Sequence, residues 1–97
     1  MKPEIMLMLN NVPIEKIKFT AVPIGTVREL ALSVQNTGDI MIDELEFEPE
    51  HDDVKVVIAP TELNVNQKSV LVIQYKPETQ IDEGLNTALK IKGKYVI

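Results

Sequence analysis

Apolar and polar residues alternate along much of this chain with the period of two that is typical of β-strands. Between Leu30 and Gln35, for example, every second residue is leucine or valine, and the residues between them are small or polar. Such alternation turns one face of a strand toward a core and the other toward water. The same kind of pattern predicts strands at residues 5–9, 30–35, 40–48, 54–58, 63–65, 70–75 and 85–97, and with the short segment 17–19 the number is seven or eight.

Two of these strands carry extra information. The segment 70–75 is apolar at nearly every position, which predicts a central strand that is covered on both faces. In the segment 40–48, the apolar phase slips by one residue across Asp43 and Glu44. A one-residue slip turns a strand over, so we expect a β-bulge or a bend at these two residues.

Turn signals separate the predicted strands at intervals of about 8–12 residues, and the prolines forbid helix interiors where they fall. The stretch 36–39 reads Asn-Thr-Gly-Asp, which predicts a tight turn because Asn36 and Gly38 tolerate left-handed conformations. This organisation predicts an all-β, immunoglobulin-like antiparallel β-sandwich of seven to eight strands. Its predicted core comprises Leu30, Leu32, Val34, Phe47, Val56, Ile58, Leu71, Ile73, Leu89 and Ile91.

Length and composition set limits on the protein class. The 97 residues are expected to form one domain over residues 1–97, and 44% hydrophobic residues suffice for one core. The net charge of −5 argues against nucleic-acid and anionic-membrane partners. The apolar run 5–9 is too short for a signal core, and no cysteine is present. We therefore expect a cytoplasmic or virion-associated protein without a classical secretion signal.

Several segments in order resemble the ASH and major-sperm-protein-like (PapD-like) immunoglobulin-fold domains. They are 17–19 (IKF), 22–26 (VPIGT), 30–38 (LALSVQNTG), 58–60 (IAP), Leu63 and 72–77 (VIQYKP). The resemblance covers about residues 17–77 and implies a non-catalytic interaction or assembly domain. Relatives of major sperm protein bind peptides through basic residues, but this chain has no matching basic cluster, so that activity is not expected here. Independently of the resemblance, Gly25 is expected to provide an unusual backbone angle between two strands.

His51 is the single histidine, and acidic residues flank it at positions 48, 50, 52 and 53. Catalysis would require a nucleophile or acid partner, and the serines at 33 and 69 suggest none. A calcium loop would require a glycine-assisted turn, which the acidic stretch lacks. We therefore expect an exposed loop histidine and a solvated acidic loop, with no enzymatic activity, no metal, no cofactor and no small-molecule substrate.

The candidate interaction surface consists of Met6, Met8, Lys90, Lys92 and Lys94. Met6 and Met8 are read first as core or strand residues. The first strand is apolar on both faces, however, so burial on one side only would leave methionine exposed and available for docking. The three lysines alternate along the last strand, and Glu44, Glu46 and Glu48 do so on an earlier one. These charged stripes either keep sheets from pairing or meet as complementary patches between two copies of the chain.

The expected function is therefore that of a non-enzymatic module that binds a protein partner or forms a homo-oligomer. In its most concrete form it is a small component of a larger assembly, such as a virus or phage particle. The alternative is a cytoplasmic adaptor domain resembling the ASH and major-sperm-protein group. A small ligand-binding protein or hydrolase is disfavoured, because four aromatic residues are few for a ligand cleft.

Overall fold

A computed structural model describes residues 4–19, 23–78 and 85–96 of the chain. Ile97 and most of the predicted loop at 77–84 lie outside these ranges. The described strands are β1 (Ile5–Leu9), β2 (Val12–Pro13), β3 (Ile17–Phe19), β4 (Arg28–Asn36), β5 (Met41–Pro49), β6 (Val54–Ile58), β7 (Lys68–Tyr75), β8 (Leu85–Thr87) and β9 (Leu89–Val96). Every pairing between them is antiparallel, so the all-β prediction is confirmed.

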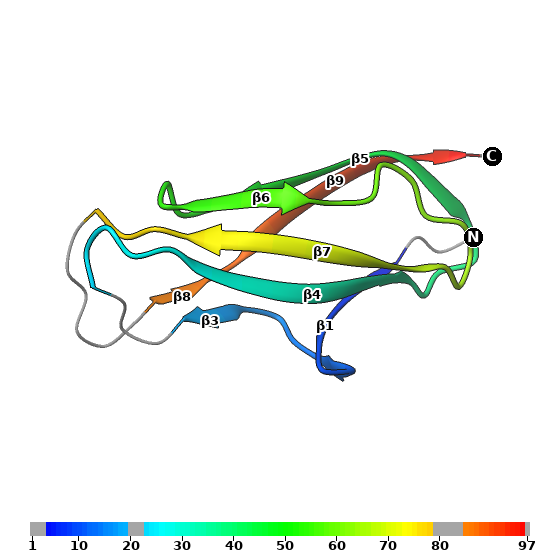
Figure 1. Cartoon of the computed structure of the whole chain (residues 1–97). Coiled ribbons are helices and arrows are strands. Elements are labelled where there is room, and N and C mark those ends of the chain that lie inside the picture. The colour runs from blue at the N-terminus through cyan, green and yellow to red at the C-terminus, as the bar shows by residue number, and fades with distance from the viewer. Residues whose placement is uncertain (1–3, 20–22, 79–84, 97) are drawn as a thin grey trace.

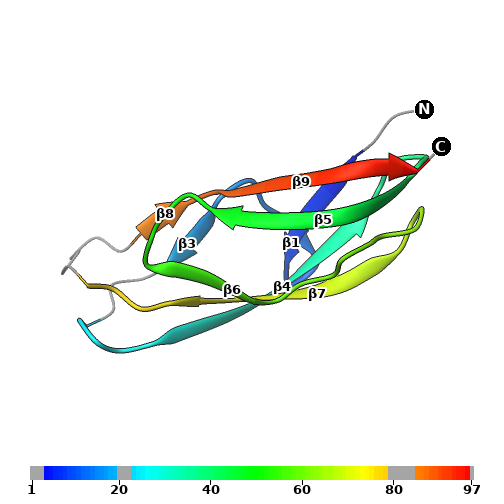
Figure 2. The same ribbon diagram turned by 90° about the horizontal axis from the view of Figure 1, so that it is seen from above.

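The largest sheet has five strands in the order β2-β1-β4-β7-β6. The predicted strand at 70–75 corresponds to β7, which is central as expected because it pairs with both β4 and β6. Two further pairs, β3 with β8 and β5 with β9, complete the strand pairing. Figure 1 shows the long strands running side by side. In the view from above, β5 and β9 lie in a layer separate from β4 and β7 of the five-stranded sheet (Figure 2).

The core is one cluster of buried side chains to which six strands and Leu63 contribute. Of the ten predicted core residues, Leu32, Val34, Leu71 and Ile73 are buried, and five others pack against the cluster while partly exposed. Ile58 is an error of the prediction, because 56% of it is exposed. The register of β6 on β7 shifts between Val56 and Ile58, and this irregularity turns Ile58 to the outer face.

The bulge predicted at Asp43 and Glu44 is confirmed. The register of β5 on β9 shifts between Asp43 and Glu46, and Glu44 has a positive φ of 51°. The slip lets both Ile42 and Leu45 point into the core although they are three residues apart. Gly25, at a φ of 84°, also adopts the unusual backbone angle expected of it.

The turn after β4 does not use the left-handed conformations that Asn36 and Gly38 tolerate, because neither is among the described residues with a positive φ. The Asn36 side chain is instead fully buried and acts as a hydrogen-bonding centre. Its Nδ2 donates to the carbonyls of Ile40 at 2.8 Å and Leu63 at 3.0 Å, and its Oδ1 accepts from the Gly38 amide at 3.0 Å. The turn is therefore formed by a side chain that replaces backbone partners.

Two short segments were misassigned from the sequence. The predicted strand 63–65 is reduced to one bridge between Leu63 and Ile42, and Val65 is exposed. Conversely, β2 was not predicted. It forms because Asn10 and Asn11, with φ values of 52° and 65°, make a two-residue hairpin turn that pairs Leu9 with Val12.

Gly93 occupies an inward-facing position of β9, opposite the bulge of β5. A Cβ atom at this position would lie 2.5 Å from Cγ2 of Ile42 and 3.1 Å from Cδ2 of Leu45. The bulge directs both side chains over the glycine, so the strand has no room for a larger residue there.

We expect Asn36→Ala to lower the free energy of unfolding by about 2–4 kcal/mol, because two buried carbonyls and one amide lose their partner. Equilibrium unfolding in urea measures the change. The control is Asn86→Ala, which removes an exposed amide on β8 and should change stability by less than about 0.5 kcal/mol. Equal effects of the two substitutions would show that the Asn36 network contributes nothing to stability.

We expect Gly93→Ala to destabilise the fold by about 1–3 kcal/mol through overpacking. The Ile42→Leu substitution removes the methyl group that a Cβ atom would meet first. Gly93→Ala should therefore cost less in the Ile42→Leu background, and a double-mutant cycle of urea unfolding measures the difference. The explanation is wrong if the cost is the same in both backgrounds.

Candidate protein-interaction surfaces

The lysine stripe and the acidic stripe lie next to each other within one molecule. The pairing of β5 with β9 sets Lys90 opposite Glu48, Lys92 opposite Glu46 and Lys94 opposite Asp43. All three lysines are exposed, as are Glu44, Glu46 and Glu48. Opposite charges at facing positions of two paired strands stabilise the pairing by about 0.2–1 kcal/mol per pair.

Two of the lysines form ion pairs with this acidic stripe. Nζ of Lys94 lies 2.9 Å from Oε2 of Glu44, and Nζ of Lys92 lies 3.4 Å from Oε1 of Glu48. The hydrogen bond from Lys94 to Glu44 and the charge of Glu44 raise the pKa of Lys94 above its ordinary value. The expectation that the two stripes meet between copies of the chain therefore needs correction, because they already pair within one copy.

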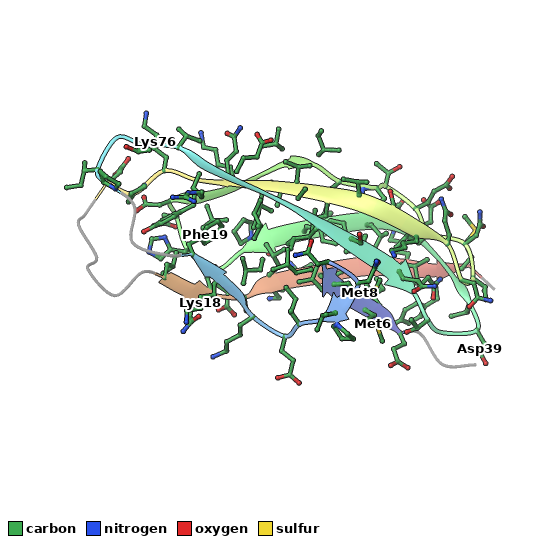
Figure 3. The ribbon with its side chains drawn as sticks, turned by 60° about the horizontal axis from the view of Figure 1, so that its bottom comes forward. Met6, Met8, Lys18, Phe19, Asp39 and Lys76 are labelled. Carbon is green, nitrogen blue, oxygen red and sulfur yellow. The ribbon has the colours of Figure 1, made fainter. Side chains whose placement is uncertain are left out.

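Met6 and Met8 lie on β1, on the face of the five-stranded sheet that points away from the core (Figure 3). The register places Met6 beside Gln35 and Met8 beside Ser33 of β4, whereas Leu7 pairs with Val34 of the core. Met6 is half-buried and only 6% of Met8 is exposed. The interpretation of Met8 as an exposed docking residue is therefore wrong.

An apolar area that the sequence did not reveal continues from Met8 across this outer face. Cross-strand pairing aligns Met8, Ser33 and Val70 in one row, and Ala31, Val72 and Ile58 in the next. We call Met8, Ala31, Ile58, Val70 and Val72 the outer patch. Val70 is 54% exposed, and Ile58 is similarly exposed. The apolar residues at 70–75 predicted a strand with two apolar faces, but only the register across four strands shows that the outward apolar residues lie together.

Polar residues flank the outer patch along the strands. Glu29 and Gln74 form one neighbouring row, joined by a hydrogen bond of 2.9 Å, and Gln35 and Lys68 form the row on the other side. An apolar centre with a polar rim is the usual anatomy of a protein–protein contact.

His51 is not the freely exposed loop residue that was expected, because its side chain is only 32% exposed. Its Nδ1 accepts a hydrogen bond of 3.1 Å from the Asp53 amide, and its ring meets that of Tyr75 edge-on at 6.2 Å. Asp53 is itself engaged, since its Oδ2 accepts from the Glu78 amide. These contacts give His51 and Asp53 structural roles in shaping the loop before β6.

The acidic loop brings no metal centre together in the part of the chain that the structure describes: no group of three or more histidine, aspartate or glutamate side chains there could hold an ion. In the same ranges no helix is long and apolar enough to cross a membrane.

We expect Glu44→Gln to lower the pKa of Lys94 toward its ordinary value of 10.5, because the partner loses its negative charge. The pKa is raised in the folded state, so the stabilisation from this pair is complete below 10.5 and is lost as the pH rises through the folded value. A titration of the Lys94 side chain followed by NMR measures the shift. Glu15→Gln, which removes a carboxylate that does not pair with Lys94, is the control, and an unchanged pKa of Lys94 in Glu44→Gln would contradict the assignment.

Comparison with known proteins gives no relative from which a function could be transferred. No family model, no curated protein and no solved structure matches the chain.

Proposed function

We propose that this chain is an immunoglobulin-like, non-enzymatic module that binds other proteins as a small component of a larger assembly, such as a virus or phage particle. The order of its strands supports the immunoglobulin-like architecture. The chain leaves the five-stranded sheet after β4 to form β5, returns for β6 and β7, and leaves again for β9, which pairs with β5. Repeated crossing between two sheets that enclose a common core is typical of Greek-key β-sandwiches.

The outer patch is the observation that carries the proposal. A β-sheet that faces water normally presents polar residues outward, yet Ala31, Ile58 and Val70 are all exposed here. They surround Val72 and Met8, which are nearly buried by their neighbours on the same face. Contiguous apolar residues with a polar rim are removed from water when another protein covers them, and this gain favours association.

The alternative, a cytoplasmic adaptor resembling the ASH and major-sperm-protein group, would use the same kind of surface for a different purpose. The two proposals differ in what lies opposite the outer patch. A structural component is held in one fixed contact at constant stoichiometry, whereas an adaptor exchanges between partners.

Site-specific photo-cross-linking tests the proposal. A photoreactive amino acid replaces Val70 in the natural host, and the matched control carries it at Val65, an exposed valine of a turn outside the outer patch. We expect discrete adducts from position 70 and none from position 65. One adduct of constant yield supports an assembly component, and several different adducts support an adaptor. If position 70 gives no adducts, the outer patch is not a contact surface and the proposal fails.

A further inference from the structure

The strands β5 and β9 pair with each other, and their two outer edges differ in whether another segment of the chain forms hydrogen bonds with them. The outer edge of β5 is covered by the segment 61–63. The amide of Leu45 donates to the Thr61 carbonyl at 2.9 Å, and Ile42 and Leu63 exchange two hydrogen bonds of 3.0 and 2.9 Å. In this way the first half of the outer edge of β5, from Ile42 to Leu45, finds backbone partners.

The outer edge of β9 has no such cover from any described residue. The neighbouring β8 pairs with β3. Ile17, the first residue of β3, lies opposite Thr87, so β3 does not extend alongside β9, which begins at Leu89. From Leu89 to Val96 the only strand partner within the described ranges is β5. No residue in the described ranges pairs with this row of backbone amides and carbonyls of β9, which can therefore pair with water or with another chain.

A groove runs beside this edge, between β9 and the start of β1. It has a volume of about 230 Å³ and is lined by Glu4, Ile5, Ile42, Ile91, Lys92, Gly93 and Tyr95. Three of these residues are isoleucines, and Tyr95 adds an aromatic ring that is largely exposed. A strand placed alongside β9 would turn every second side chain toward the isoleucines and Tyr95 of this mixed lining.

The side chains on the other face of β9 are the lysines at 90, 92 and 94. Lys92 forms an ion pair with Glu48, and Lys94 forms one with Glu44. Lys90 makes no ion pair with any described residue, although it lies opposite Glu48. A strand added to β9 would bring its outward side chains next to this basic row, where acidic residues are favoured.

We propose that the free edge of β9 accepts an extended segment of a partner protein as an additional strand. Acidic side chains of that segment alternate with apolar ones, so that the acids face Lys90, Lys92 and Lys94 while the apolar residues enter the groove. This inference rests on the proposed role as a protein-binding module and specifies a second binding site on it.

The chemistry of the edge determines this choice of occupant. Unpaired backbone groups in a row are matched only by another extended backbone, which excludes a helix or a compact small molecule as the natural partner. A second copy of β9 is also a poor match, because antiparallel pairing would set the two lysine rows against each other. An acidic, alternating segment satisfies the backbone, the groove and the lysine row together.

A synthetic peptide that alternates glutamate and valine is the probe. We expect it to bind the whole protein and to shift the NMR signals of residues 89–95 more than those of β6 and β7. N-methyl groups on alternate amides of this peptide keep its side chains but remove the hydrogen-bond donors from one of its two edges. A peptide that is methylated on the edge that pairs with β9 should not bind. Two methylated peptides, one for each edge, cover both cases.

Lys90→Glu tests the electrostatic part of the proposal and should weaken binding of the probe about fivefold or more at low salt, as expected for a cross-strand pair of reversed sign. The matched control is Lys55→Glu, an exposed lysine on β6 with the same change of charge. A peptide alternating lysine and valine should bind the unaltered protein more weakly than the glutamate peptide does.

Three results would overturn the inference. They are no binding of the glutamate peptide, equal binding of both methylated peptides and the unmodified one, or equal weakening by Lys90→Glu and Lys55→Glu. The second result would mean that the lysines attract acidic peptides without any strand being added. None of these results bears on the outer patch, which lies on the other sheet, so cross-linking from position 70 would still decide the proposed function.

Discussion

The buried amide of Asn36 ties the turn between β4 and β5 to Leu63, which lies 27 positions further along the chain. From the end of β4, its side chain reaches the start of β5 through Ile40 and the covering segment through Leu63. Its backbone amide and carbonyl are paired with Gln67 and Asn66 at 3.0 and 2.9 Å. Each of these groups would be costly to bury without a partner, so the turn, the loop before β7 and the beginning of β5 are fixed relative to one another.

This constraint explains why the two edges of the β5–β9 pair differ. Holding Leu63 at the Asn36 amide also holds it beside Ile42, where its backbone covers the edge of β5. No comparable anchor among the described residues brings a segment to β9. The bulge at Asp43 and Glu44 adds to this asymmetry. It directs Ile42 and Leu45 over Gly93, so β9 packs closely against β5, whereas the other edge of β9 has no strand partner among the described residues.

Local patterns predicted most of the strands, the bulge and the backbone of Gly25, because each depends on a few neighbouring residues. The errors involve contacts between distant segments. Asn36 was assigned a turn conformation that asparagine often adopts, but the carbonyl of Leu63, 27 positions away, gives it another role. Ile58 follows its strand's alternation in the sequence, and only the irregular register against β7 turns it outward. The outer patch depends on the register of four strands, and no linear pattern reports it.

The charged stripes show how a surface feature changes meaning once its neighbours are known. Viewed along the sequence, Glu44, Glu46 and Glu48 and the three lysines were two separate patches of opposite sign. Within the fold they adjoin and largely offset each other, so the net charge of −5 is carried by the rest of the chain. Long-range attraction to this face is therefore weak. A partner that binds β9 must be recognised at short range, by hydrogen bonds to the open backbone and by the charge of Lys90, and both require an extended chain in register.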